Sequence, residues 1–414
     1  MRGISLVSAV VIGSAACGGN GGAGGAAVTR DSAGVSIVEN SGPVWAAGQE
    51  WKVIDSVMVD IAGDIDSVTG PVRLADGRLA IANAGTHEVR VYAAAGSRLH
   101  ASGRAGSGPG EYQMLAGIWR GPGDSLLVSD FLARRVTVLD KDATFVRSFS
   151  LGGNTGAMVP TGGRFEFALP QGWLADGSVV GVTMSFVLNQ TREGRYRDTV
   201  SALRYGPDGA VRDTIARFPG AEMEQMTMSM GGQSFSAPTP VPLGRQSVST
   251  VHGDRFYLAQ NNAWEVEVRE ADGNLVRLIR VDAGARPLTP ADIAAHRKAQ
   301  LDQIEGIPMM RNMPEAFKKQ LTDRIEQAKY PATLPFVAAL LIDSESNLWA
   351  QEVTPPGDAR ASYSVFDGSG RLLGRVTMPA DFRAASIGAD AVYGVWKDSE
   401  DVEHVRAYPL RKGP

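Results

Sequence analysis

Cysteine and aromatic residues are scarce in this chain of 414 residues. Cys17 is the only cysteine, which excludes an internal disulfide and any metal site built from several thiolates. Aromatic residues make up 7% of the chain while glycine occurs 49 times, so the composition favours many short strands joined by tight turns. The formal net charge of -4 offers no excess positive charge for phosphate groups, which argues against nucleic acid as the main partner.

The N-terminus has an apolar run, Ile4 to Ile12, but it is too short for the roughly 20 residues that span a bilayer. Arg2 precedes the run and small residues follow it, which is the order of a secretory signal. The stretch from Gly13 to Gly18 resembles the processing site of bacterial lipoproteins, in which the cysteine becomes the acylated first residue, although Ser14 stands where that family usually has Leu. Residues 1–17 are therefore predicted to be a signal peptide with lipidation at Cys17, and the alternative is plain secretion.

Residues 18–50 are predicted to be a tether and a lead-in to the folded body. The tether begins GGNGGAGGAA and continues to about Gly34, and glycine at this density cannot repay the entropy lost on ordering. A flexible tether behind a lipid anchor indicates a protein of the cell envelope, held outside the cytoplasm on a membrane surface.

One pattern recurs through the rest of the chain: a turn with Asp or Gly, two short alternating apolar strands, and a second such turn. Its spacing of about 45–50 residues, where loops are short, matches a four-stranded propeller blade. Residues 51–414 are therefore predicted to be all-β, a six-bladed β-propeller. The copies begin at Leu74, Gly123, Leu174, His252, Ser344 and Gly388.

The first two copies also resemble a known repeat. Ala82–Tyr92 and Val128–Val138 are similar to the hairpin of NHL repeats, and Gly106–Tyr112 resembles the loop between consecutive blades of that family. Asp31–Val35 resembles the start of bacterial six-bladed propeller lipoproteins, whereas Asn83 stands where the NHL repeat usually has Asp. The resemblance implies the same propeller fold.

Strand counting predicts how the ring closes. The last copy lacks an outermost strand after Tyr408, and the segment Trp51–Asp60 has no partner of its own. We expect this segment to pair antiparallel with Glu403–Tyr408, which removes an exposed edge.

Three long connections interrupt the repeat: residues 187–200, 219–244 and 283–335. The third is predicted to be a two-helix insertion between blades four and five, with one helix from Pro290 to about Ile304 and another from about Pro314 to Lys329. The first joins the second and third strands of a blade, and the other two join consecutive blades. Because both kinds of connection lie on the same face and the blades are neighbours, we expect the three to form a lid over one side of one mouth of the ring.

Methionines gather in this expected lid, and their side chains adapt to varied apolar ligands. They are therefore candidate ligand-binding residues, with packing of the helices and a Cu(I) thioether site as alternatives. The candidates are Met226, Met228, Met230, Met309, Met310 and Met313.

Motifs of the common enzyme classes are missing: the sequence has no G-x-S-x-G elbow, no P-loop and no H-E-x-x-H. We predict no catalytic residue, no metal and no cofactor. The favoured function is a membrane-tethered binding module for a small molecule, a peptide or a partner protein. One alternative is a propeller enzyme of the lactonase or lyase type with a metal in the central channel, and another is a structural interaction module of the envelope.

Overall fold

The computed structural model describes residues 27–153, 164–187, 192–230, 233–306 and 313–413. Three of the six sheets found there have four antiparallel strands each, numbered here in chain order. Sheet one contains β5 (Val68–Arg73), β6 (Leu79–Asn83), β7 (Glu88–Tyr92) and β8 (Arg98–Ser102). Sheet two contains β9 (Leu115–Arg120), β10 (Leu126–Asp130), β11 (Arg135–Leu139) and β12 (Phe145–Phe149). Sheet five contains β22 (Val337–Ile342), β23 (Leu348–Glu352), β24 (Arg360–Phe366) and β25 (Leu372–Ala380).

The other three sheets are larger. Sheet three contains β13 (Arg164–Trp173), β14 (Val179–Val187), β15 (Arg195–Tyr205), β16 (Val211–Met230) and β17 (Gln233–Pro240). Sheet four contains β18 (Val248–His252), β19 (Arg255–Ala259), β20 (Glu265–Glu270) and β21 (Leu275–Val281), extended by β2 (Val35–Asn40) and β1 (Ala27–Ser32). Sheet six contains β26 (Phe382–Ile387), β27 (Ala391–Lys397) and β28 (Glu403–Arg411), with β3 (Lys52–Val53) and β4 (Val59–Ile61) on its outer edge.

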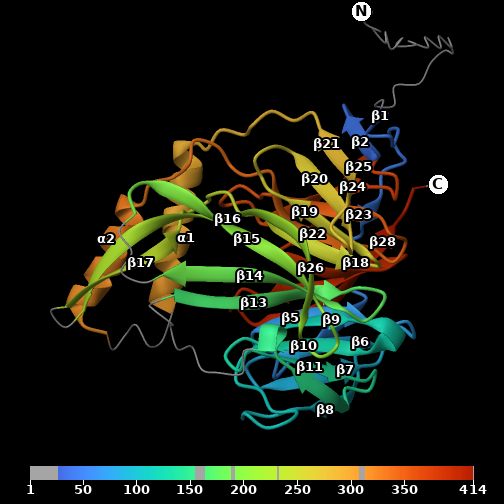
Figure 1. The fold of residues 1–414 in the computed structure, drawn as a ribbon, viewed down its shortest axis with the longest axis horizontal. Coiled ribbons are helices and arrows are strands. Elements are labelled where there is room, and N and C mark those ends of the chain that lie inside the picture. The colour runs from blue at the N-terminus through green and yellow to red at the C-terminus, as the bar shows by residue number, and fades with distance from the viewer. Residues whose placement is uncertain (1–26, 154–163, 188–191, 231–232, 307–312, 414) are drawn as a thin grey trace, which may run out of the picture.

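The first strand of each sheet contacts the first strand of the next, and β26 returns to contact β5, so the sheets follow one another in a closed ring. Residues of neighbouring sheets share each apolar core; Val89 and Val91 of sheet one, for example, pack with Leu126 and Val128 of sheet two. The second strands of sheets one and two are buried along their whole length, as expected of strands covered on both faces. The molecule is mostly β and propeller-like (Figure 1).

The predicted pairing of the two ends of the chain is confirmed. Val405 and Ala407 of β28 pair antiparallel with Ile61 and Val59 of β4, and Leu410 pairs with Val53 of β3. The last sheet therefore takes its outer strands from the beginning of the chain.

The lead-in differs from a flexible tether between Ala27 and Asn40. Strands β1 and β2 form a hairpin, and β2 pairs parallel with β21 on the edge of sheet four. Val38 is fully buried there, and Asn40 accepts the N–H of Leu372 at 2.8 Å and donates to Gly370 O at 3.1 Å. The buried contacts of Val38 and Asn40 supply the stabilisation that a glycine-rich tether lacks.

The expected loops of sheet three are mostly strands, so the loop prediction is wrong for residues 195–200 and most of 219–244. Strand β16 alone runs for 20 residues, and its far half pairs with β17 from Met223–Pro240 to Met230–Gln233. The alternation of methionine with threonine and serine from Met226 to Met230 has the period of a strand. Figure 1 shows strands β13 to β17 reaching beyond the ring toward the two helices.

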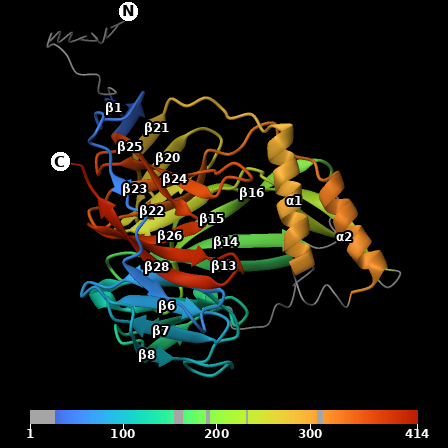
Figure 2. The ribbon, with the colours of Figure 1, turned by 180° about the vertical axis from the view of Figure 1, so that it is seen from behind.

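Helices α1 (Pro290–Gly306) and α2 (Glu315–Gln327) lie in the chain between β21 and β22 and stand beside these long strands (Figure 2). Thr289 and Asp292 cap the start of α1, since Asp292 N–H donates to Thr289 Oγ1 at 3.1 Å and Thr289 N–H donates to Asp292 Oδ2 at 2.9 Å. The apolar stripe of α2 faces sheet three: Phe317 and Leu321 line a groove against β16 and β17. Neither helix, nor any other helix in the described ranges, is long and apolar enough to cross a membrane.

Candidate functional site

Sheet three divides into two ribbons. Strands β13 and β14 pair along their length, from Trp173–Val179 to Arg164–Val187, but β14 pairs with β15 only from Val179 to Val182. Where this pairing ends, the N–H of Ser201 donates to the side chain of Thr183 at 2.9 Å. Beyond Thr183 the ribbon β13–β14 separates from the ribbon β15–β16–β17.

A cavity of about 770 Å³ opens between the two ribbons and the first strands of sheets four and five; we call it the sheet-three cavity. Its apolar lining includes Val200 of β15, Phe218 of β16 and Leu340 of β22. Met184 of β14, on one ribbon, and Met223 of β16, on the other, both line the cavity. Both ribbons of sheet three and one strand each of sheets four and five therefore line one mostly apolar space.

A bulge places a polar group in this cavity. In β13, Pro170 pairs with Gly181 and Gly172 pairs with Val180, so Gln171 is an extra, unpaired residue. Gly172 adopts φ +149, and a Cβ atom there would lie 3.2 Å from Val251 Cβ, so the bulge favours glycine. The side chain of Gln171 lines the cavity and accepts a hydrogen bond from Ser249 Oγ at 3.2 Å.

A charged cluster forms part of the cavity wall. Arg192 donates to Asp198 Oδ1 at 2.6 Å, and its guanidinium lies 4.0 Å from the centre of the Tyr196 ring. The hydrogen bond to Asp198 raises the pKa of Arg192 above its ordinary value. The hydroxyl of Tyr196 accepts a hydrogen bond from Gln225 at 3.3 Å, which fixes the ring against β16.

Arg197 holds the longer ribbon against sheet four. It points away from the neighbouring Asp198 and donates to three backbone carbonyls, those of Gly220 at 2.7 Å, Gln260 at 3.0 Å and Pro219 at 3.2 Å. Its guanidinium also reaches Ser247 Oγ at 3.0 Å. Burial, followed by the nearby charge of Arg245, lowers the pKa of Arg197 below its ordinary value. The ribbon that forms one wall of the cavity is thus fixed to the neighbouring sheet.

Of the methionines predicted as ligand-binding residues, the two whose side chains the structure describes, Met226 and Met313, are not part of the lining of the sheet-three cavity. Met226 is half-buried and lines the groove between β16 and α2, and Met313 is half-buried just before α2. Met228 and Met230 belong to β16, but their side chains lie outside the described part of the structure, as do Met309 and Met310 entirely. A ligand role for these six stays a prediction, and the same holds for Cys17, which lies outside the described residues.

Sequence reasoning missed Met184, Gln171, Tyr196 and Val200. Tyr196 and Val200 fall in the connection 187–200 that was expected to be part of the lid, whereas Met184 and Gln171 fall in a blade. Nothing in the sequence indicated that the strands holding Met184 and Val200 separate to form a cavity. A usable signal was the length of the polar and aromatic segment from Arg192 to Thr199, which exceeds a hairpin turn.

Among the residues with described positions, no group of three or more His, Cys, Asp or Glu could hold a metal ion. Asp198 is the one carboxylate among the described residues that line the sheet-three cavity, and it is paired with Arg192. The cavity therefore offers apolar contact, amide and hydroxyl groups, and one ion pair.

No protein-family model matches the sequence, and no curated protein is significantly similar to it. Solved structures with a similar fold include a Bacteroides fragilis protein provisionally named as exported, with 12% identity and a TM-score of 0.47, covering 91% of this chain and 100% of that chain. A member of the DUF4221 family from Bacteroides vulgatus has 8% identity and a TM-score of 0.45, covering 88% and 100%. Virginiamycin B lyase from Staphylococcus aureus has 10% identity and a TM-score of 0.39, covering 87% and 99%. At these identities the likeness concerns the fold alone.

Proposed function

We propose that this protein is a lipid-tethered six-bladed β-propeller outside the cytoplasm, and that it binds a small, largely apolar molecule in the sheet-three cavity. The observation that carries the proposal is the division of sheet three, which opens about 770 Å³ between β14 and β15 and against the first strands of sheets four and five. Cavities of this size, apolar with a few fixed polar groups, are typical of small-molecule sites.

The lining indicates the kind of ligand. An apolar surface is formed by Phe218, Val200 and Leu340. The flexible side chains of Met184 and Met223 can adapt to apolar ligands of different shapes. Gln171 and Ser249 offer an amide and a hydroxyl from adjacent strands. An apolar body bearing one or two hydroxyl or amide groups matches this combination.

Two features of the sequence support the tether. The segment ending at Cys17 has the order of a lipoprotein signal, and the glycine-rich stretch that follows separates the anchor from the hairpin β1–β2. A binding site on a tethered ring would meet ligands at the membrane surface.

The test is a titration of the chain from Gly18 onward with N-phenyl-1-naphthylamine, an apolar dye whose fluorescence rises in apolar surroundings. Ala338 is an exposed residue on β22 that lines the cavity, so Ala338→Trp should fill the space and weaken dye binding by about tenfold or more.

Ala116 provides the matched control. Ala116 and Ala338 are both exposed alanines at bulges of first strands, but Ala116 lies on β9 in sheet two and does not line the cavity. Ala116→Trp should leave dye binding within about twofold of the parent. Equal binding by both variants, with thermal unfolding unchanged, would contradict the proposal.

A further inference from the structure

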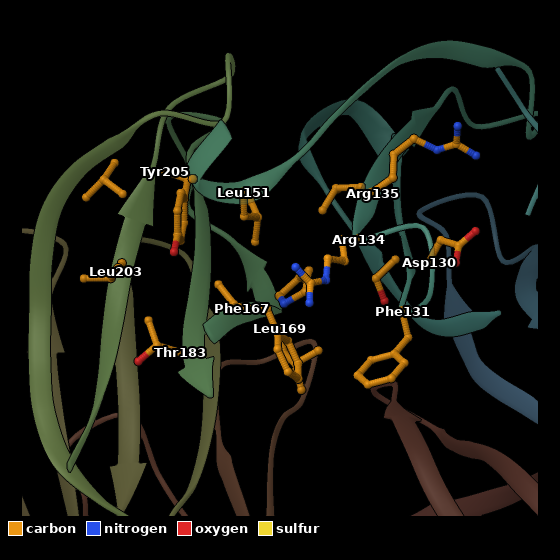
Figure 3. Close-up of a pocket in the computed structure, with 16 residues that line it drawn as sticks. Asp130, Phe131, Arg134, Arg135, Leu151, Phe167, Leu169, Thr183, Leu203 and Tyr205 are labelled. Atoms are coloured by element: carbon orange, nitrogen blue, oxygen red, sulfur yellow. The ribbon is translucent and has the colours of Figure 1, made fainter. Parts of the chain in front are cut away.

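A second cavity, of about 310 Å³, lies between sheets two and three, and Arg134 projects into it. Figure 3 shows Arg134 between the strands of sheet three on one side and Asp130 and Phe131 on the other, whereas Arg135 points away. Arg135 is held by backbone carbonyls, those of Ser107 at 2.9 Å and of Glu111. Both arginines belong to the lining, but Arg134 is the one whose guanidinium is directed into the cavity.

The side chain of Arg134 has no hydrogen bond or ion pair with any residue in the described ranges. The nearest acidic residue of the lining, Asp130, already accepts three backbone N–H groups, from Gln113 at 2.7 Å, Ala133 at 3.0 Å and Met114 at 3.1 Å. These bonds tie the Asp130 carboxylate to the start of β9 and to its own turn. The guanidinium of Arg134, half-buried in a cavity, keeps its donors available.

Aromatic rings lie beside this guanidinium. Arg134 Cζ is 5.6 Å from the centre of the Phe167 ring, and Phe167 packs edge-to-face against Phe131 with ring centres 5.5 Å apart. Leu151 and Leu203 continue the apolar wall away from the arginine. The cavity thus has a cationic end and an apolar, partly aromatic body.

The backbone of Arg134 is explained by the hairpin, but its side chain is not. Arg134 has φ +48, and His87, at the corresponding position of the hairpin in sheet one, has φ +57. Asn or Asp adopts this left-handed conformation more readily than Arg. The turn therefore requires the conformation without requiring a long cationic side chain.

We propose that this cavity is an anion site for a small aromatic carboxylate, with Arg134 binding the carboxylate and Phe131 and Phe167 packing against the ring. Arginine matches a carboxylate with two parallel N–H donors, and its planar group stacks on aromatic faces. This site adjoins the sheet-three cavity, because Leu169 and Thr183 line both. Arg134, Phe131 and Phe167 line only this site, so its test is independent of the function proposed for the other cavity.

Benzoate and benzyl alcohol serve as a matched pair of probes, titrated by calorimetry into the full chain in a non-ionic detergent at neutral pH. Benzoate should bind about tenfold or more tightly than benzyl alcohol, because only the anion uses the charged donors. Arg134→Gln should weaken benzoate binding by about tenfold or more, and Arg134→Lys should weaken it less because the positive charge remains.

Arg98→Gln is the control, since Arg98 is an exposed arginine of β8 outside the cavity. It should leave benzoate affinity within about twofold of the parent, and thermal unfolding should report that all variants are folded. The proposal is overturned if benzoate shows no binding at about 10 mM, if Arg134→Gln binds it as the parent does, or if benzyl alcohol binds equally well.

Discussion

His404 Nδ1 lies 2.7 Å from Asp60 Oδ1, across a separation of 344 residues in the chain. Arg406 reaches the other oxygen of the same carboxylate, at 2.9 Å, and its guanidinium lies 3.4 Å from the centre of the Trp396 ring. These side-chain hydrogen bonds and ion pairs reinforce the backbone pairing of β4 with β28. The two ends of the chain are therefore joined by side chains as well as by backbone hydrogen bonds.

Asp60→Asn should lower the free energy of unfolding at pH 7 by less than about 1 kcal/mol, because the Asp60 side chain is 37% exposed and solvent screens the ion pair. Burial raises the pKa of Asp60, but the hydrogen bonds from His404 and Arg406 outweigh it, so the pKa lies below its ordinary value of 3.8. The stabilisation by the Asp60 carboxylate is therefore fully present when the pH is above the ordinary pKa of Asp. It is lost as the pH falls through the pKa that Asp60 has in the folded protein.

Denaturant unfolding at pH 7 and at about pH 3 measures this difference, which should shrink at the lower pH. Asp282→Asn is the control, because Asp282 is exposed and has no ion pair among the described residues. If the difference in the free energy of unfolding between Asp60→Asn and the parent grew on acidification, it would contradict a stabilising role of the Asp60 contacts.

Arg197→Met should destabilise the protein by about 2–3 kcal/mol, because it keeps much of the apolar stem but leaves the carbonyls of Gly220 and Gln260 without their charged donor. Denaturant unfolding gives this value. Hydrogen exchange should also rise in β15 and β16, since the ribbon loses its attachment to sheet four. Arg217→Met, at an exposed position of β16, should change stability by less than about 0.5 kcal/mol; equal effects of the two substitutions would refute the role of Arg197.

Excision of residues 289–331 should leave a folded ring. Leu288 N–H donates to Ala332 O at 3.0 Å and Pro287 pairs with Thr333, so a short glycine-serine turn can join the stem below the helices. None of the described residues of the excised segment, 289–306 and 313–331, lines the sheet-three cavity, so dye affinity should stay within about twofold. The exposed face of β16 and β17 should promote association, measured by light scattering. If the variant folded but lost dye affinity, the helices would instead control access to the sheet-three cavity.

Cys17→Ser should move the protein from the membrane fraction to the soluble fraction, because the serine cannot carry the thioether-linked lipid. Fractionation followed by immunoblotting measures this distribution, and Ser14→Leu, which approaches the usual lipoprotein pattern, should keep the protein in the membrane. An unchanged distribution of Cys17→Ser would rule out lipid anchoring as the membrane contact.

The repeated turns made much of the ring predictable. Asp76-Gly77, Asp176-Gly177 and Asp272-Gly273 each mark a tight turn between strands, and glycine adopts positive φ at all three positions. The closure was predictable from an unpaired strand at each end of the repeat. Thr289, Pro290 and Asp292 likewise gave the start of α1 from local chemistry alone.

The candidate site was not predictable in the same way. In a strand that extends beyond its blade, side chains alternate between the two faces in the same way inside and outside the ring. The local sequence therefore does not show where β14 and β15 separate. The cavity depends on Thr183 taking the place of a backbone acceptor, and on Gln171 being displaced by a bulge, both of which are settled by contacts between distant segments. The methionines of the expected lid were predicted to bind a ligand because they gather there in the sequence. In the structure Met184 lines the sheet-three cavity, and Met226 does not.

Photolabelling with an apolar benzophenone tests the central proposal most directly, because the excited ketone inserts preferentially into methionine side chains that it touches. The protein is irradiated with the probe, digested, and mapped by mass spectrometry. We predict labelling of Met184 and Met223, which line the sheet-three cavity, and loss of this labelling in Ala338→Trp. Labelling concentrated on Met226 and Met313, with Met184 and Met223 unmodified, would contradict it and assign apolar binding to the region of α2 instead.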